Sequence, residues 1–424
     1  MIQILDYNKI EPNEIFARKS YQNDVSASVK EIIDNVKENG DKAVLEYTEK
    51  FDKVVIQNLE VTQKEIDEAF ETVDDEFLDI IREAAENIRK FHQKQVRNSF
   101  IISENNGIVL GQKITPIEKV GLYVPGGTAA YPSTVLMDSI PAFIAGCPEI
   151  VMTTPPSKDG KVNPVILAAA KIAGVTRIFK TGGAQAIAAL AYGTETVPRV
   201  DKIVGPGNAF VAEAKKQVYG QVSIDMIAGP SEILIVADGN SNPAHAAADL
   251  LSQAEHDVNA SAVLVTDSRE LAQKVSAELE KQLPLLPRYE IARKSIDNNG
   301  KIIITESIAQ AITISNLLAP EHLELMVDNP FDILDSVKNA GSVFMGRNCP
   351  EALGDYFAGP NHTLPTGGTA RFSNPLSVDD FIKKTQFTYY TADALANIGD
   401  KVAYFARKEG LEAHARSVDA RKKD

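Results

Sequence analysis

The chain has 424 residues, of which 44% are apolar and 24% charged, and its formal net charge at pH 7 is −14. This length exceeds one ordinary hydrophobic core, and the composition is typical of a soluble globular protein. The negative charge argues against nucleic acid or an anionic membrane as the main partner, because binding to phosphate groups needs clustered Lys and Arg. Small molecules and other protein chains remain as partners.

The N-terminus lacks the basic and apolar regions of a signal peptide, and no apolar run approaches the roughly 20 residues that span a membrane. The two cysteines, Cys147 and Cys349, cannot form a disulfide framework. They are expected to be small, buried, reduced side chains. These features together predict a cytoplasmic location.

The first part of the chain, residues 25–95, is predicted to be helical. Apolar residues recur three and four positions apart in segments 26–40 and 62–93. Asn39-Gly40 predicts the end of the first helix. Thr62, with Glu65 three residues later, predicts a capping box at the start of the second.

From Thr115 onward, short β-rich runs alternate with helix-like stretches of ten to fifteen residues. This alternation is typical of βαβ units and a parallel sheet. It extends over more than 200 residues, too far for one sheet, so we expect two Rossmann-like α/β lobes. The predicted strands lie at 119–125, 149–156, 177–183, 202–207, 232–238 and 262–268, and the intervening helices include 163–174, 184–194 and 208–220.

Small-residue turns follow three of the predicted strands, although the G-x-G-x-x-G fingerprint is absent. The nearest match has Gly205 and Gly207 but Phe210 in place of the third glycine. Glycine turns at the carboxyl ends of parallel strands let backbone amides approach a phosphate. One such turn alone indicates a tight βα turn, whereas three in succession are as consistent with a bound ligand. The turn residues able to contact a bound ring or ribose are Tyr123 beside 125–127, Gln185 and Asn208.

Four of the six histidines stand near a carboxylate or carboxamide. Gln253 and His256 are three apart on a predicted helix and should share a face. Asp355 precedes His362 by seven residues, and His414 follows Glu409 by five. Such nitrogen and oxygen donors suit Zn²⁺, and Mn²⁺ or Co²⁺ less strongly. Spacing alone does not assemble ligands from segments so far apart.

Glu321 stands directly beside His322 and just after Pro320. One interpretation is a pair of proton-handling groups, and the other is a chance neighbour pair on a helix surface. Adjacent residues can face one ligand only near the end of an element or in a loop. Pro320 favours a helix N-terminus here.

Several long segments, in order, resemble the histidinol dehydrogenase family, and the resemblance runs from about residue 20 into the tail. They are VGLYVPGG, STVLMD, GGAQAIAALAYGT, VGPGNAFVAEAKKQV, IDMIAGPSEILIVAD, DLLSQAEHD, APEHLEL and LGDYFAGPNHTLPTGGTARF. The resemblance implies oxidation of L-histidinol to L-histidine, the end of histidine biosynthesis. It implies two successive hydride transfers to NAD⁺ through an aldehyde-level intermediate, in a zinc-dependent homodimer.

The resemblance also implies a role for each motif residue. The implied zinc ligands, for one Zn²⁺ per subunit, are Gln253, His256, Asp355 and His414. The implied NAD-binding residues are Tyr123, Gln185 and Asn208. Ser231, His362 and Glu409 would line the substrate pocket with His322 and the zinc ligands, and Glu321 and His322 would form the acid–base pair.

The expected organisation follows from these assignments. A first lobe comprises 21–122 and 232–378 and carries the acid–base pair with most of the zinc ligands. The second lobe, 123–231, binds NAD. Residues 1–20 form an N-terminal segment, and the tail 379–424 crosses to the partner subunit of the homodimer, where Glu409 and His414 would serve the other site.

Three other functions fit parts of the pattern. A thiol-dependent aldehyde dehydrogenase would use Cys147 or Cys349, although neither has a histidine nearby in sequence. A zinc hydrolase would use Glu321 as base for a metal-bound water. A non-catalytic α/β binding protein would keep only the fold.

Overall fold

The computed structural model describes residues 1–10, 15, 24–104, 106–126 and 130–421. Gly127 of the first glycine turn and one end of each of the expected segments 1–20, 21–122 and 379–424 lie outside the described residues. Two compact units make up the chain: Met1–Gln95 with Glu118–Phe381, and Val96–Ile117 with Ile382–Asp424. None of the helices in the described ranges is long and apolar enough to cross a membrane.

A five-stranded parallel sheet forms one lobe of the first unit. Its strands are β4 (Lys119–Tyr123), β5 (Glu149–Thr154), β6 (Arg177–Lys180), β7 (Lys202–Val204) and β8 (Ser223–Ile224), in the order β6-β5-β4-β7-β8. Numbered along the chain this order is 3-2-1-4-5, that of a doubly wound Rossmann sheet. The order reverses between β4 and β7, so the ligand crevice is expected at their carboxyl ends. The connecting helices are α5 (Pro132–Ala145), α6 (Pro164–Ala173), α7 (Gly183–Tyr192) and α8 (Ala209–Val218).

A six-stranded parallel sheet forms the other lobe. Its order is β1-β11-β10-β9-β12-β13. Strands β9 to β13 repeat the 3-2-1-4-5 order, and β1 pairs along the outer edge of β11. The strands are β1 (Gln3–Asp6), β9 (Glu232–Ala237), β10 (Ser261–Thr266), β11 (Lys301–Ile304), β12 (His322–Met326) and β13 (Ser342–Met345). The prediction of two Rossmann-like lobes without the usual fingerprint is confirmed.

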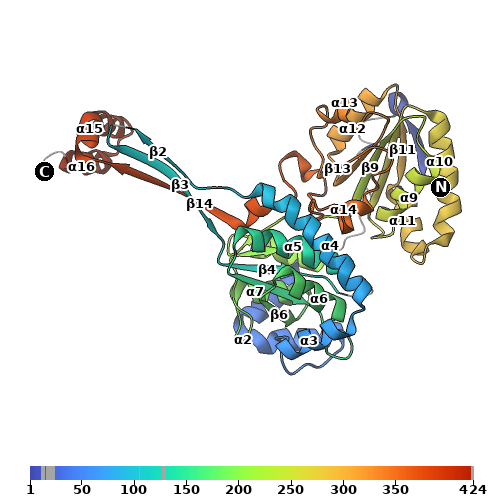
Figure 1. Cartoon of the computed structure of the whole chain (residues 1–424), viewed down its shortest axis with the longest axis horizontal. Coiled ribbons are helices and arrows are strands. Elements are labelled where there is room, and N and C mark those ends of the chain that lie inside the picture. The colour runs from blue at the N-terminus through green and yellow to red at the C-terminus, as the bar shows by residue number, and fades with distance from the viewer. Residues whose placement is uncertain (11–14, 16–23, 105, 127–129, 422–424) are drawn as a thin grey trace. The chain divides into compact units, whose positions relative to one another are not determined.

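Helices cover both faces of the six-stranded sheet (Figure 1). In β9, Ile233 and Ile235 pack with one set of helices, and Leu234 and Val236 pack with α12 on the other face. Alternate residues of a strand point to opposite faces, so an apolar run such as EILIVA is buried on both sides. The covering helices are α9 (Pro243–Ala254), α10 (Arg269–Gln282) and α11 (Tyr289–Asn299) on one face and α12 (Ile308–Leu318) on the other.

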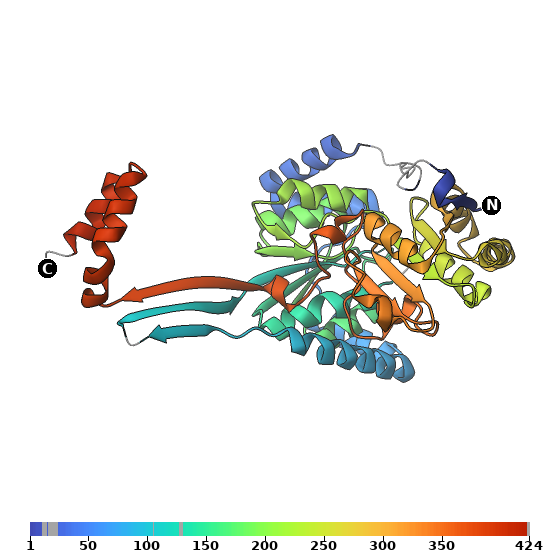
Figure 2. The same ribbon diagram turned by 90° about the horizontal axis from the view of Figure 1, so that it is seen from above.

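The N-terminal helices pack on the five-stranded lobe. Helix α2 (Ser26–Asp52) contacts α7 and α8, while α3 (Gln63–Thr72) contacts α6 and α4 (Asp75–His92) contacts α5. In Figure 2, α2 (blue) lies along the light-green helices of that lobe. These contacts group the helices with β4 to β8, whereas the sequence analysis assigned 21–122 to the lobe of residues 232–378. The apolar faces of the helices find their complement on α5 to α8, which sequence order does not reveal.

Two predicted helix boundaries are confirmed, and one predicted helix differs from the structure. The capping box of Thr62 and Glu65 is present. Gly40, with φ +52° and ψ −133°, is not helical, so the first helical stretch of α2 ends there as predicted, and a second stretch continues to Asp52. The single helix predicted over 62–93 is two helices, because Asp74 accepts a hydrogen bond from the Phe77 amide at 2.8 Å and begins α4.

The second unit contains the antiparallel strands β2 (Phe100–Glu104), β3 (Ile108–Pro116) and β14 (Ile382–Tyr390), and the helices α15 (Ala392–Lys408) and α16 (Glu412–Ala420). The buried side chains of the two helices are small, Ala394, Ala403 and Ala415. Large apolar side chains are exposed, including Ile101 at 66% and Phe405 at 67%. This unit therefore has little core of its own and presents apolar surface.

Asp138 on α5 is a fully buried carboxyl group of the first unit. Its Oδ1 accepts a hydrogen bond from the Thr363 hydroxyl at 2.8 Å. Burial, together with the nearby Asp225 and against the Thr363 hydrogen bond and the charge of Lys215, raises the pKa of Asp138 to about 8. Because this pKa exceeds that of a carboxyl in the unfolded chain, the folded protein holds the proton between about pH 4 and pH 8 while the unfolded chain has lost it. Stability contributed by Asp138 therefore falls as the pH rises through this range.

We expect Asp138→Asn to be more stabilising at pH 8 than at pH 5, because an amide keeps the acceptor oxygen and cannot ionise. The change in the free energy of unfolding should differ between the two pH values by about 3 kcal/mol. Urea unfolding of both proteins at pH 5 and pH 8 measures it. An equal effect of the substitution at the two pH values would contradict the assignment.

Candidate active site

A cavity of about 630 Å³ lies at the carboxyl ends of the five-stranded sheet. All three predicted NAD-binding residues line it. Tyr123 ends β4, Gln185 lies in the first turn of α7 and Asn208 is the N-cap of α8. The cavity therefore occupies the position where a Rossmann-like sheet binds a ligand, at the reversal between β4 and β7.

The polar groups of this cavity are fixed by local hydrogen bonds. The Tyr123 hydroxyl accepts from the Gly183 amide at 3.1 Å, and burial raises the pKa of Tyr123 to about 12. Asn208 Oδ1 accepts from the amides of Phe210 and Val211. Gln185 is buried, and its Oε1 has no hydrogen-bond partner among the described residues. An unsatisfied buried carboxamide beside a glycine turn fits a ligand with hydrogen-bond donors, such as a nicotinamide or a ribose.

A second centre lies at the amino ends of β9 and β12. His322 is the first residue of β12 and is in register with Ile233 of β9 and Ser342 of β13. His322 Nδ1 lies 2.9 Å from the Glu232 carbonyl oxygen, so this nitrogen carries the hydrogen and donates it. Nε2 is then the basic nitrogen, and within the described parts of the chain it has no hydrogen-bond partner.

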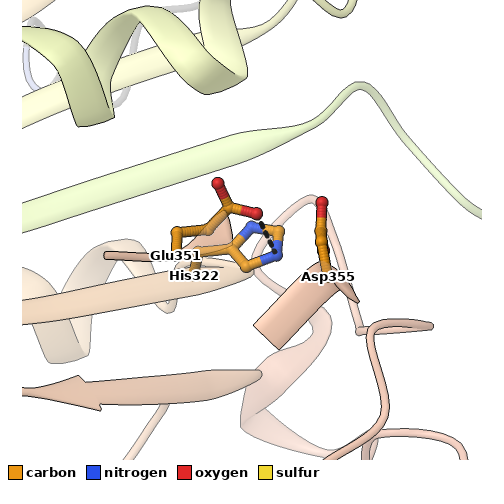
Figure 3. A group of neighbouring side chains, drawn as sticks. All are labelled: His322, Glu351 and Asp355. Carbon is orange, nitrogen blue, oxygen red and sulfur yellow. Dashed lines mark ion pairs between the residues drawn. The ribbon is translucent and has the colours of Figure 1, made fainter. Parts of the chain in front are cut away.

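Glu351 and Asp355 approach this free nitrogen (Figure 3). Glu351 Oε1 lies 3.8 Å from His322 Nε2, and ligand atoms of His322, Glu351 and Asp355 lie within 4.8 Å of one another. Glu351 directly precedes α14 (Ala352–Tyr356), which carries Asp355. The sequence analysis missed Glu351. Its signal was the i, i+4 spacing to Asp355, which places two carboxylates on one helix face.

Glu321 lies on the other side of the imidazole. Its Oε2 accepts a hydrogen bond from the Glu232 amide at 2.9 Å and lies 3.7 Å from His322 Nδ1. Burial raises the pKa of Glu321 well above its ordinary value, and nearby carboxylates raise it further. The predicted helix N-terminus at Pro320 is wrong. Pro320 follows the left-handed cap of α12 at Ala319, and a strand begins two residues later.

Gln253 and His256 lie beside the same acidic groups. Gln253, in the last turn of α9, is buried and hydrogen-bonds to the Glu351 carboxylate. His256 lies two residues beyond the end of α9, although its amide still bonds to the Gln253 carbonyl oxygen at 3.1 Å. His256 is close enough to Glu351 and His322 for their charges to interact. The prediction that the two side chains share one helix face is therefore wrong, because His256 lies outside α9.

His362 joins this group from the loop after α14. Its Nδ1 lies 3.7 Å from Asp355 Oδ1, and burial together with the nearby His322 lowers the pKa of His362 to about 4. The loop is anchored to α5, because Asn361 Nδ2 donates to the Met137 carbonyl oxygen at 2.6 Å. His362 is therefore a neutral side chain in a fixed loop.

The remaining predicted site residues lie outside this cluster of contacts. Ser231 directly precedes β9 and is half-buried. Glu409 caps the end of α15, and His414 lies in α16. Both are exposed residues of the second unit. Their part in the site stays a prediction.

The cluster fits a divalent cation. Burial, and then the charge of Glu351, raises the pKa of Asp355 to about 9. Two buried atoms, Glu351 Oε1 and His322 Nε2, have no hydrogen-bond partner among the residues that the structure describes. A cation bound beside them would neutralise the crowded carboxylates of Glu351 and Asp355. Imidazole, carboxylate and carboxamide donors without a thiolate fit Zn²⁺ with positions left open for a ligand.

Comparison with known proteins decides the family. The family model described as histidinol dehydrogenase matches residues 16–422. The chain belongs to the histidinol dehydrogenase family. Membership makes it an oxidoreductase of histidine biosynthesis.

Individual members of the histidinol dehydrogenase family align along nearly the whole chain. The enzyme of Clostridium acetobutylicum is 59% identical over 398 residues, which cover 94% of this chain and 92% of that protein. The enzyme of Bacillus subtilis is 54% identical over 396 residues, 93% of each chain. A crystal structure of histidinol dehydrogenase from Elizabethkingia anophelis has a TM-score of 0.94 at 41% identity and covers 100% of this chain and 98% of that chain. The resemblance seen in the sequence is confirmed.

Proposed function

We propose that the chain oxidises L-histidinol to L-histidine in two successive NAD-dependent hydride transfers through an aldehyde-level intermediate. The observation that carries this proposal is His322, a buried imidazole whose Nδ1 is fixed by the Glu232 carbonyl and whose Nε2 is free. The test is formation of NADH from NAD⁺ and L-histidinol. Its absence from the metal-loaded protein would contradict the proposal.

His322 is proposed to take the hydroxyl proton of the alcohol. Burial lowers the pKa of His322 below that of a free imidazole, so the ring is neutral at pH 7 and able to accept a proton. NAD⁺, when bound, accepts the hydride. Tyr123, Gln185 and Asn208 would hold it, because all three line the cavity at the reversal of the five-stranded sheet.

Glu321 is proposed to activate the water that converts the aldehyde level into a hydrate. The hydrate is required because a second hydride can leave only after water has added. The raised pKa of Glu321 makes its carboxylate a stronger base toward water, and the Glu232 amide fixes its orientation. His322 then acts again as base in the second transfer.

The zinc site is proposed to comprise Gln253, His256 and Asp355 of one subunit with the partner subunit's His414. When bound, the ion would fix the substrate through its imidazole and amine, as a template. Glu351 would orient Gln253 through the hydrogen bond between them. Ser231, His362 and Glu409 would line the substrate pocket.

A homodimer is proposed from the exposed apolar surface of the second unit. A surface of this kind on a three-stranded sheet and two helices is typical of an interface. The exposed large apolar side chains are Val96, Phe100, Ile101, Ile102, Leu110, Phe387, Tyr389, Val402, Tyr404, Phe405 and Leu411. A cytoplasmic location is part of the same proposal and is supported by the two free cysteines, Cys147 and Cys349.

Co-expression of His256→Ala and His414→Ala chains is expected to restore activity that each variant lacks alone. If the tail serves the partner's site, a mixed dimer contains one site in which every residue is native. Random pairing should then give about a quarter of the native activity per subunit, since half the dimers are mixed and half their sites intact. Tagging the two chains differently and purifying the mixed dimer measures this directly.

A matched control is co-expression of His256→Ala with Asp355→Ala, two residues of the same unit. Every site in that mixture lacks one native residue, so no activity should return. Activity that stays absent in the His256→Ala and His414→Ala mixed dimer would contradict the shared site.

A further inference from the structure

The cavity of the five-stranded lobe contains an aspartate with no assigned task. Asp52, the last residue of α2, lines it together with Tyr123, Gln185 and Asn208. Within the described ranges the lining carries two charged side chains, Asp52 and the exposed Lys158. No arginine of those ranges lines it.

The Asp52 carboxylate is not satisfied by the protein. Its Oδ2 is buried and has no hydrogen-bond partner among the described residues. Burial alone raises the pKa of Asp52 to about 6, and the carboxylate is close enough to Tyr123 to raise the pKa of that hydroxyl. Asp52 is thus charged at neutral pH in a place where a charge is costly unless something binds it.

The fold does not account for this carboxylate. The carbonyl end of a helix carries a partial negative charge, so an acidic last residue is unfavourable there. The helix is ended by Lys53, which adopts the left-handed conformation with φ +59° and donates from Nζ to the Lys50 carbonyl oxygen. Asp52 contributes nothing to this cap, which points to a ligand as its partner.

The neighbouring Phe51 indicates which part of a dinucleotide lies here. Its ring lines the same cavity and is 48% exposed. The ring stacks on Tyr47, with 5.6 Å between the two ring centroids, and its remaining exposed surface is available to pack against a flat base. A carboxylate beside a bound adenine is suited to accept hydrogen bonds from both ribose hydroxyls, and it would repel a phosphate on the 2′ oxygen.

We propose that Asp52 binds the ribose hydroxyls of the adenosine half of the cofactor and is the residue that selects NAD over NADP. This inference rests on the proposed NAD-dependent function and extends it to cofactor specificity. A carboxylate accepting from a neutral donor is worth about ten-fold or more in affinity. The absence of arginine from the described lining removes the usual partner of a 2′-phosphate.

The test is to measure how tightly the full chain binds NADH and NADPH, using the fluorescence of the reduced nicotinamide to detect binding. The chain has no tryptophan, so its own emission interferes little. The native protein should bind NADH at least about a hundred-fold more tightly than NADPH. Asp52→Asn, which keeps the size of the side chain, should weaken NADH binding about ten-fold and reduce the preference by a similar factor. An unchanged ratio of the two dissociation constants in Asp52→Asn would overturn the inference.

Two further variants make the result specific. Asp159→Asn removes the same charge from the loop beside Lys158 but lies outside the lining, so the preference should stay native. A shift equal to that of Asp52→Asn would mean a general charge effect and overturn the inference. Tight NADPH binding by the native protein, lost in Lys158→Ala, would assign the 2′ position to Lys158 and overturn it as well. A native protein that binds neither nucleotide would overturn the proposed function itself. An unchanged ratio of the NADH and NADPH dissociation constants, in a protein that binds both, would overturn only the role of Asp52.

Discussion

Replacing His322 with asparagine is expected to lower kcat by about 10²–10⁴-fold, the usual contribution of a general base. Asparagine is chosen because its Nδ2 takes the place of the imidazole Nδ1 and can still donate to the Glu232 carbonyl oxygen. The substitution therefore removes Nε2 and preserves the hydrogen bond that fixes the ring. Steady-state kinetics with L-histidinol, and separately with the aldehyde-level intermediate, measure the loss in each half-reaction.

The loss should affect both half-reactions, because the same base serves both. NADH binding should stay native, since His322 lies in the other lobe from the cofactor cavity. His245→Asn is the matched control, because His245 is an exposed histidine of α9 outside the cluster. A His322→Asn enzyme that turns over within a few-fold of the native rate would exclude His322 as the base.

Asp355→Asn is expected to weaken zinc binding by at least about 100-fold and to abolish activity at stoichiometric metal. The substitution keeps the shape of the side chain and removes a carboxyl group that loses its proton when a cation binds. Without a cation, burial and Glu351 raise the pKa of this group to about 9. Metal retained after dialysis against a competing chelator measures the affinity without reference to turnover. Excess Zn²⁺ should restore part of the activity.

Asp257→Asn is the control for this experiment, because it makes the same substitution at an exposed position beside His256. Native metal retention in Asp355→Asn would contradict the role of Asp355 as a ligand.

Glu351→Gln distinguishes two arrangements of the site, one in which Glu351 binds the metal and one in which it only orients Gln253. A larger loss of metal in Glu351→Gln than in Asp355→Asn would mean that Glu351 is itself a ligand and does not act through Gln253.

The sequence indicated the two lobes because hydrophobic strands and helices alternate with clear turn signals. The glycine turns also led to the correct edge of the five-stranded sheet, since Tyr123, Gln185 and Asn208 line one cavity. In the other lobe the site does not lie at the carboxyl ends of the parallel strands, because His322 is at the amino end of β12. The order of the strands in a sheet decides at which end a site forms, and one sequence alone does not reveal that order.

The spacing of residues in the sequence does not predict which side chains come together in the acid–base cluster. The spacing of Glu351 and Asp355 indicates a shared helix face, but Glu351 approaches His322 only because β13 and α14 return the chain to the amino end of β12. Asp52 was missed for the same reason, since α2 packs on α7 and α8 and brings its end to the cofactor cavity. Pro320 was misinterpreted because a proline after a helix cap resembles a proline that begins a helix.

The central claim is that one site carries out both oxidations and needs a bound metal ion to do so. Its most direct test is the number of NADH molecules formed per L-histidinol consumed, before and after removal of metal by a chelator. The account predicts two NADH and one L-histidine, no turnover after chelation, and recovery with Zn²⁺. One NADH per substrate, or full turnover without metal, would contradict it.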